Sequence, residues 1–356
     1  MNPPRMRYLV TGATGFVGRH LLKEMVKNSQ ARPFALARSL DSWEAQDWTW
    51  RLGSVELVEG SVLQPGKWMS DPRLEGLQGI FHLAAVIRHS RKDPEEMVRT
   101  NVEGLLNMIR LGAKYRCRVV FVSTSGTVGC FRSPEEWADE ESPYCESVVG
   151  SWPYYHSKIQ AEKEARELAT TLGVELVILR PPMLLGPGDH RYRATSLILR
   201  VLSGKLPFVV RGGMHFVDIR DAVRAFLQAM VIPNPRPVYH LPGTQCTIDE
   251  FFGMIAEISG VPAPKLHVPA VVAQTFAAWG NRIGDLLSLK NPLLPDRVVF
   301  EMGSHYWGTR SRYAQELGFV ARSGRMTLKD TIDWIKANHK GLSQLTQNNS
   351  GVRRAA

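Results

Sequence analysis

The sequence predicts an α/β protein: a doubly wound parallel sheet followed by a smaller C-terminal lobe of mixed α/β structure. Up to about residue 180, short apolar runs alternate with helical periodicities, and a glycine-rich turn joins the first run to the first helix. Beyond it, Pro181-Pro182 and Gly186-Pro-Gly-Asp-His190 break that alternation. We therefore expect a sheet domain over residues 6–180, a second lobe over 181–338 with some interleaving, and a disordered tail over 339–356.

The composition is that of an ordinary globular chain. Of 356 residues, 44% are hydrophobic and 22% are charged, and no run approaches the ~18 apolar residues of a membrane span. Nothing at the N-terminus resembles a signal peptide. We predict no metal site, no integral membrane span and a cytoplasmic protein. We also predict free thiols, because the four cysteines share no metal-ligand spacing: Cys117, Cys130, Cys145 and Cys246.

The formal net charge of +10 raises the question of nucleic-acid binding. Basic residues, however, occur in small scattered groups, such as Arg88-His-Ser-Arg-Lys92 and Arg353-Arg354. No zinc-finger, basic-zipper or aromatic RNA-binding signature accompanies them. The charge therefore indicates a solvated surface, with some cations facing an anionic cofactor or substrate, and no nucleic-acid partner.

The first predicted strand, Arg7-Tyr-Leu-Val-Thr11, runs into Gly12-Ala-Thr-Gly15-Phe-Val-Gly18, and a helix follows. Gly12 permits the tight turn, Gly15 lets a pyrophosphate approach the backbone, and Gly18 lets the helix pack on the strand. The helix N-terminus offers amide hydrogens to phosphate. This pattern predicts a dinucleotide site.

A second strand, Pro33-Phe-Ala-Leu-Ala37, ends at Arg38. A site that prefers NAD usually has an acidic residue about 20 positions after the glycines, where it binds the ribose 2′-hydroxyl. Arg38 would instead attract a 2′-phosphate, which favours NADP over NAD. The alternative is that Arg38 is solvated and that Asp41 serves the ribose or caps a turn.

Two further strands, over residues 55–58 and 80–85, precede a helix over about 95–115. The small Ala84-Ala85 pair would let a cofactor ribose approach the end of its strand. Asn101 lies within the helix, where a polar residue needs hydrogen-bond partners, and structural support is its simplest role.

The fifth strand, Arg118-Val-Val-Phe-Val122, ends in Ser123-Thr-Ser-Gly-Thr127. Because ligands bind at the carboxyl ends of parallel strands, these hydroxyls are well placed to hold a substrate oxygen. A serine in a loop is often only a turn residue, so the pattern alone leaves both roles open.

The next predicted helix, over about residues 151–172, carries a tyrosine and a lysine one turn apart. A buried lysine needs a partner or a task, and its ammonium would lower the pKa of the phenol, which suits proton transfer. Glu162 is expected to lie largely outside the buried face. The residues that share that face are Tyr154, Lys158, Ala161, Ala165, Leu168 and Leu172.

After a sixth strand over 174–180, the second lobe is less regular. We expect a helix that begins at Asp221, a strand over 238–241, and a helix opened by the capping pattern Thr247-Ile-Asp-Glu250. The mostly apolar residues 268–289, with Trp279, predict an amphipathic helix or pair that packs in this lobe. A lid or a membrane-facing surface is the alternative.

These motifs jointly resemble the extended short-chain dehydrogenase/reductase superfamily, in its NAD(P)-dependent epimerase/dehydratase family. The nearest branch looks like that of the dihydroflavonol reductases and 3-beta-hydroxysteroid dehydrogenases. The likeness covers residues 6–337. It rests on Thr11 to Gly18, His82 to Ala85, Thr100 to Gly104, Ser123 to Val128, Tyr154 with Lys158, Leu179 to Pro182, Gly186 to Asp189 and Phe216 to Asp221.

The resemblance implies a Rossmann-type sheet domain, a substrate-binding C-terminal lobe and NAD(P) as cofactor. It places catalysis on Ser125, Tyr154 and Lys158; Tyr155 is excluded because Ile159 stands four positions after it. The cofactor contacts that follow are Gly12, Thr14, Gly15, Phe16, Val17, Gly18, Arg38, Leu83, Ala84, Ala85, Asn101, Lys158 and Pro181. The substrate contacts that we predict are Arg88, Trp152, Tyr192 and His215.

Two positions depart from the family pattern. The family often has an aspartate after the third strand, which contacts adenine, where this chain has Ser61-Val-Leu63. Later it usually carries a histidine where Asp218 stands. Neither departure touches the proton-transfer residues.

The sequence thus predicts an NAD(P)-dependent oxidoreductase that exchanges hydride with a carbonyl or alcohol on a small molecule, with Tyr154 as acid/base. A nucleotide-sugar epimerase or dehydratase with tightly bound NAD would use the same three residues and is the alternative. A catalytically silent cofactor-binding protein is the third interpretation. A homodimer is a further expectation.

Overall fold

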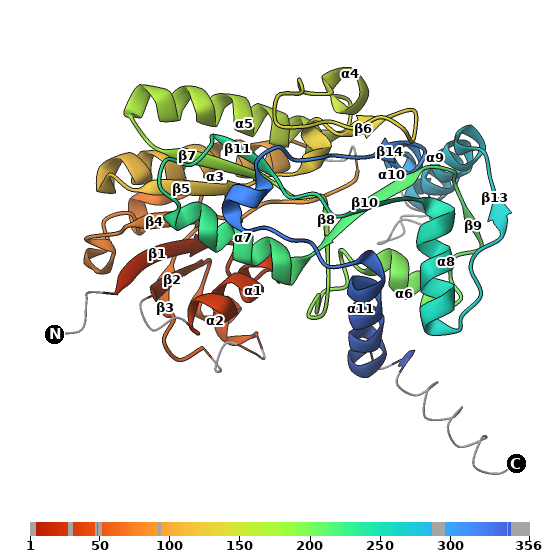
Figure 1. Ribbon diagram of the computed structural model, residues 1–356, viewed down its shortest axis with the longest axis horizontal. Helices are drawn as coiled ribbons and strands as arrows, with labels where there is room; N and C mark the ends of the chain where they lie inside the picture. The colour runs from red at the N-terminus through yellow and green to blue at the C-terminus, as the bar shows by residue number, and fades with distance from the viewer. Residues whose placement is uncertain are drawn as a thin grey trace, which may run out of the picture.

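The computed structural model describes residues 5–27, 31–46, 48, 52–90, 94–286, 296–339 and 341–342, without the side chains of 284–286 (Figure 1). The tail beyond residue 342, with Arg353-Arg354, lies outside these residues, as do 91–92 and 287–289. Leu342, within the stretch 339–356 that was expected to form the tail, is buried in the core of the second lobe; the bounds of the two lobes and the tail stay a prediction.

Seven parallel strands form the main sheet, in the order β11-β7-β5-β4-β1-β2-β3. The order reverses beside β1, as in a doubly wound sheet, so the predicted fold class is confirmed. The strands are β1 (Met6–Thr11), β2 (Ala31–Ala37), β3 (Glu56–Glu59), β4 (Gly79–His82), β5 (Arg118–Val122), β7 (Leu176–Arg180) and β11 (Val238–His240).

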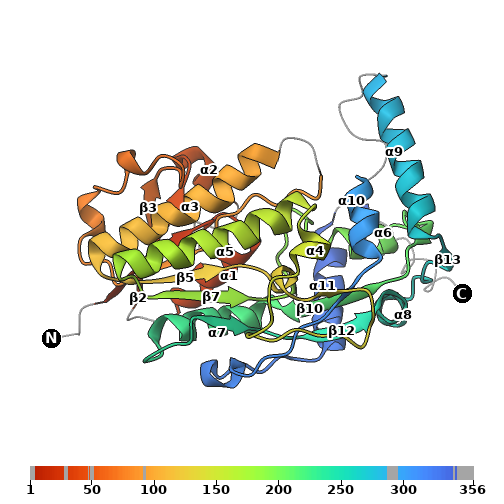
Figure 2. The ribbon, with the colours of Figure 1, turned by 90° about the horizontal axis from the view of Figure 1, so that it is seen from above.

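Helices cover both faces of this sheet. On one face lie α1 (Phe16–Met25) and α7 (Ile219–Val231), and on the other lie α3 (Pro94–Tyr115) and α5 (Pro153–Leu172), side by side (Figures 1 and 2). The short α2 (Leu40–Glu44) follows β2.

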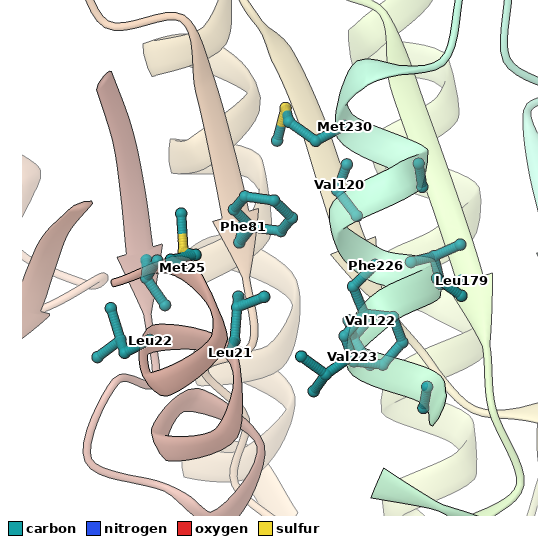
Figure 3. Close-up of a cluster of buried hydrophobic side chains, with 14 of the residues drawn as sticks. Leu21, Leu22, Met25, Phe81, Val120, Val122, Leu179, Val223, Phe226 and Met230 are labelled. Atoms are coloured by element: carbon teal, nitrogen blue, oxygen red, sulfur yellow. The ribbon is translucent and has the colours of Figure 1, made fainter. Parts of the chain in front are cut away.

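Consecutive strand residues point to opposite faces, because side chains alternate along a strand. Phe81, Val120 and Leu179 pack against α1 and α7, as the close-up shows (Figure 3). Their neighbours Ile80 and Val119 pack under α3 and α5. Near-continuous apolar strands are what a sheet buried on both faces requires.

The second lobe is built on a three-stranded sheet, β12-β10-β8, with β8 (Met183–Leu185), β10 (Gly213–Asp218) and β12 (Thr244–Thr247). Its core involves α6 (Ser196–Leu202), α8 (Ile248–Ser259) and α11 (Gly324–Asn338). Two small pairs complete it: β9 (Phe208–Val209) with β13 (Leu266–His267), and β6 (Cys130–Phe131) with β14 (Tyr306–Trp307). The remaining helices are α4 (Glu146–Val149), α9 (Ala270–Leu286), α10 (Arg297–Gly303), and the 3-10 turns η2 (Pro65–Lys67), η3 (Pro72–Leu74), η4 (Ser125–Thr127) and η5 (Ala314–Leu317).

Two boundaries differ from the sequence expectation. The fourth strand ends at His82 rather than residue 85, because the amides of Leu83 and Ala84 donate to the Thr11 hydroxyl instead of a neighbouring strand. The helix expected to begin at Asp221 begins at Ile219, capped by the Asp218 carboxylate. By contrast, the capping box of Thr247 at the start of α8 is confirmed.

The apolar stretch from residue 268 forms α9, but the expectation that it packs inside the lobe is wrong for most of its large side chains. Ala273 and Ala277 are buried, whereas Phe276 and Trp279 are exposed. Small side chains make the contact with the body, so the large ones on the other side of the helix remain in solvent. Within the described part of the chain, no helix is both long and apolar enough to cross a membrane.

Candidate active site

The turn after β1 forms a glycine cradle beside the end of β4. Gly12 has φ +66°, and a Cβ there would lie 2.7 Å from the backbone of Leu83 and Ala84. A Cβ on Gly18 would lie 2.4 Å from the carbonyl oxygen of Gly12. Gly15 is the N-cap of α1. Because glycine has no side chain, no side-chain oxygen accepts from the first amides of this helix. Such amides are suited to an anion.

Thr11 and His82 were quoted from the sequence only as the first residues of two motifs and not as site residues, and their side chains connect this turn to β4. The Thr11 hydroxyl lies 2.9 Å from Nδ1 of His82 and accepts from the amides of Leu83 (3.2 Å) and Ala84 (3.1 Å). Burial, with a smaller effect of the Lys158 charge, lowers the pKa of His82 to about 3. The imidazole is therefore neutral, and its hydrogen bond with Thr11 connects the end of β4 to the end of β1. Half-buried side chains of Thr14, Phe16 and Val17 follow in the turn and first helical turn.

Arg38 is exposed at the end of β2 and makes no ion pair with a described residue. The alternative for Asp41 as a cap is wrong, because Ser39 is the N-cap of α2 and forms a reciprocal capping box with Ser42. The Ser61 hydroxyl after β3 accepts from the amide of Leu63 at 3.3 Å, within a local turn. Among the residues that the structure describes, none pairs with the Arg38 guanidinium at this edge.

Lys158 lies buried where β4 and β5 end. Its Nζ donates to the carbonyl oxygen of Val122 at 3.1 Å and lies 4.6 Å from the centre of the Phe121 ring. Burial lowers the pKa of Lys158 to about 8, and the charge of Glu162 acts in the opposite direction. At neutral pH the side chain is still mainly an ammonium group.

Tyr154 lies in the first turn of α5, one turn before Lys158. Its hydroxyl forms no hydrogen bond with the described residues, so it is available to a ligand. Burial raises the pKa of this hydroxyl. The expected lowering by Lys158 is therefore not found, because the ammonium is directed at Val122 and desolvation of the phenolate dominates.

Tyr155 is a packing residue, as its register indicates. Its ring stacks on Trp307 at 5.1 Å and meets Tyr154 edge-on at the same distance. A Cβ on Gly126 would lie 2.2 Å from this ring, so only glycine lets the Ser125 segment approach α5 here. The Ser125 amide donates to the carbonyl oxygen of Pro181 at 2.9 Å. Ser125 is buried, and no hydrogen bond joins its hydroxyl to the described residues.

The expectation that Glu162 lies outside the buried face of α5 is wrong. Its side chain is fully buried and accepts from Arg180 at 2.5 Å, from Ser123 at 2.5 Å and from Tyr144 at 3.0 Å. Leu172, expected on the buried face, is exposed. The buried face therefore turns toward Glu162, because a guanidinium from the end of β7 and hydroxyls after β5 satisfy the carboxylate.

Asn101 joins α3 to the loop after β4 and to α5. Its Oδ1 accepts from the amide of Val86 at 2.8 Å, and its amide nitrogen donates to Val86 O (3.0 Å) and the Ser157 hydroxyl (2.9 Å). These bonds engage the whole amide, which makes Asn101 a support of the loop. Its contact with the cofactor stays a prediction.

The predicted substrate residues do not gather at Tyr154. Trp152 is enclosed by Tyr155, His305 and Trp307, and His215 is enclosed beside the Gly243 amide, so neither presents a surface to a ligand. Tyr192 packs against Trp334 and His339 of the second lobe. Arg88 lies on the exposed rim, paired with Glu96 at 2.6 Å.

His89, the neighbour of Arg88, is the loop residue that reaches Tyr154. The two rings meet edge-on with centroids 5.6 Å apart, and Nδ1 of His89 is buried and has no hydrogen-bond partner among the described residues. Burial lowers the pKa of this imidazole. The only sequence signal was its place in the loop after the fourth strand, which does not distinguish it from Arg88.

Comparison with known proteins agrees with this geometry. A model of the NAD dependent epimerase/dehydratase family matches residues 8–240. A Synechocystis protein named as a candidate dihydroflavonol 4-reductase is 30% identical over 342 residues, which cover 93% of this chain and 95% of that protein. Sterol demethylase protein B of Methylococcus capsulatus is 27% identical over 93% of this chain and 98% of its own length. The crystal structure of gox2253 superposes with a TM-score of 0.76 at 26% identity, covering 94% of this chain and 98% of that one.

Proposed function

Because this chain belongs to the NAD dependent epimerase/dehydratase family, we propose that it is an NAD(P)-dependent oxidoreductase of a carbonyl or alcohol substrate, with Tyr154 as the proton-transfer residue. One observation carries the proposal most. Tyr154 and Lys158 lie at the head of α5, with Lys158 bonded to the end of β5, and neither the Tyr154 nor the Ser125 hydroxyl is used by the described protein.

The residues present fit a dinucleotide. Side chains at Gly12 and Gly18 would collide with backbone, and the uncapped N-terminus of α1 follows at Gly15. We propose that this cradle holds the pyrophosphate and that Leu83, Ala84 and Ala85 line the ribose. When bound, the dinucleotide supplies or accepts a hydride.

The chain's own residues would handle the proton. Tyr154 is a neutral phenol at pH 7, since burial raises its pKa, and can therefore donate to a carbonyl oxygen. Lys158, still mainly charged, would stabilise the phenolate that remains. Ser125 would donate a hydrogen bond to the same substrate oxygen and orient it.

The test compares Tyr154→Phe with Tyr155→Phe. We expect Tyr154→Phe to bind NADPH as tightly as wild type and to lose at least about 100-fold in turnover on a substrate found by screening alcohols, ketones and sugar nucleotides. Tyr155→Phe, one position along the same helix, should keep turnover. Near-normal turnover of Tyr154→Phe would refute the assignment.

A nucleotide-sugar epimerase or dehydratase is the second candidate, because the family name covers both reactions. Such an enzyme keeps its dinucleotide through the cycle. NAD retained through purification, and released only on denaturation, would favour it. Free exchange with added NADPH would favour the reductase.

We also propose that the cofactor is NADP, on the strength of the unpaired Arg38 at the end of β2. A cytoplasmic location is a further proposal, supported by four unpaired cysteines. The homodimer remains a prediction that analytical ultracentrifugation would test.

A further inference from the structure

Helix α9 presents an apolar stripe to solvent. We call this stripe the α9 face: Val272, Phe276, Trp279 and Ile283, which are 41%, 65%, 62% and 48% exposed. Their spacing of four, three and four residues places them on one side of the helix. Ala273 and Ala277, turned away from the stripe, are the buried residues of α9 among those whose side chains the structure describes.

We propose that the α9 face docks on an anionic lipid surface, with the helix lying in the plane of the interface. A helix of 17 residues that is apolar on one side and contains Trp and Phe has the composition of an interfacial helix. Trp279 is suited to the boundary, because its ring is apolar and its indole N–H can hydrogen-bond to water or headgroups.

Exposed basic residues near α9 favour an anionic lipid surface over a neutral one. Lys265, Arg282 and Arg297 are exposed on α9 and the elements beside it, and none forms an ion pair with a described residue. Between residues 260 and 295 the sequence has three basic residues and one acidic residue. The chain as a whole carries +10. Unpaired cations beside an apolar stripe complement anionic headgroups.

Shape and area favour a lipid surface over a second copy of this chain. Figure 2 shows α9 projecting beyond the rest of the molecule, so a flat surface can reach it without colliding with the body. The four side chains of the α9 face expose roughly 400 Å² together, taking ~150–250 Å² for a fully exposed large side chain. A stable dimer usually needs about 800 Å² on each partner.

The experiment is co-sedimentation of the full chain with vesicles. One set contains equal parts of phosphatidylcholine and phosphatidylglycerol, and the other contains phosphatidylcholine alone. The test variant is Phe276→Ser/Trp279→Ser. The matched control, Val320→Ser/Met326→Ser, removes apolar side chains that are 81% and 56% exposed around the start of α11. Thermal unfolding confirms that both variants are folded.

We expect wild type and the control to bind the phosphatidylglycerol vesicles, more weakly at high salt, and the test variant to bind about tenfold less or worse. Phosphatidylcholine alone should retain little protein. Equal binding by the test variant, or no binding by wild type, would overturn the proposal. So would sedimentation equilibrium that shows a wild-type dimer lost only in the test variant, because a second copy would then cover the face.

Discussion

The substitution Glu162→Ala removes a buried carboxylate and tests how much the Glu162–Arg180 ion pair beside the site stabilises the fold. Glu162 accepts hydrogen bonds from four side chains: Arg180 at the end of β7, Ser123 and Thr127 after β5, and Tyr144 in the loop before α4. The side chains of Glu162 and Arg180 are 0% and 4% exposed. The substitution therefore leaves a buried guanidinium and the hydroxyls of Ser123 and Tyr144 without their acceptor, whereas the Thr127 hydroxyl still donates to the carbonyl oxygen of Thr124.

The expected cost follows from this burial. When one partner of a buried ion pair is removed, the other charge stays desolvated, which costs about 3–5 kcal/mol. We therefore expect Glu162→Ala to lower the free energy of unfolding by about 4 kcal/mol. The matched control is Asp333→Ala, which breaks an ion pair of Lys329 with a similar separation of 2.7 Å but 65% and 55% exposed side chains. That change should cost at most about 0.5 kcal/mol.

The contribution of the Glu162–Arg180 pair to stability should depend on pH. Burial alone would raise the pKa of Glu162, but the Arg180 guanidinium and the Ser123 hydrogen bond hold it below its ordinary value. A carboxyl whose pKa is lowered in the folded state contributes stability above its unfolded pKa and loses it as pH falls through the folded pKa. The difference between wild type and Glu162→Ala should therefore be full near pH 7 and shrink in acid.

The assay is urea denaturation followed by tryptophan fluorescence, at neutral and acid pH. A loss below about 1 kcal/mol in Glu162→Ala would refute the reasoning, because it would mean that water or another group already satisfies the buried charges. An equal loss in Asp333→Ala would refute it too, since burial would then not be the cause.

Three further predictions use other parts of the site. Arg38→Ala should weaken NADPH binding about tenfold and leave NADH binding unchanged in titrations; equal effects on both would contradict the 2′-phosphate contact. Gly18→Ala should cost about 2 kcal/mol or more by collision with the Gly12 carbonyl, whereas Gly53→Ala, where a Cβ meets nothing within 4 Å, should cost far less in thermal unfolding. Burial lowers the pKa of Lys158 to about 8, below its unfolded value, so the unfolded chain holds the proton longer. As pH rises from 8 to about 10.4, the free energy of unfolding of wild type should therefore increase by on the order of 3 kcal/mol relative to that of Lys158→Met. Curves of unfolding free energy against pH that run parallel for the two proteins would contradict this.

The local pattern predicted most of the sheet domain. The fifth strand was expected over Arg118 to Val122 and is found there, and the helix expected over 95–115 begins at Pro94 and ends at Tyr115. Apolar runs and helical periodicity are properties of neighbouring residues, so they can be read without knowledge of the fold. The misplaced ends, such as those at His82 and Asp218, depend on hydrogen bonds to side chains.

The site was predicted less completely, and Glu162 shows why. A charged residue was assigned to the solvent side because burying an unpaired carboxylate is costly. Its partner Arg180 ends a different strand, and only the packing of α5 on the sheet brings the two within 2.5 Å. The opposite error was made for Trp152 and His215. They were predicted to contact a substrate because aromatic and imidazole side chains often line pockets, but the surrounding side chains enclose both.

The sequence by itself determined the strand–turn–helix at Gly12 to Gly18 and the one-turn spacing of Tyr154 and Lys158, because both depend only on local backbone geometry. Tertiary structure alone decided what surrounds them. It placed His89 against Tyr154, directed Lys158 at Val122 and left the large side chains of α9 in solvent. The two contacts join residues far apart in the chain, and the exposure on α9 depends on which side of the helix packs against the body. Neither can be read from residue type alone.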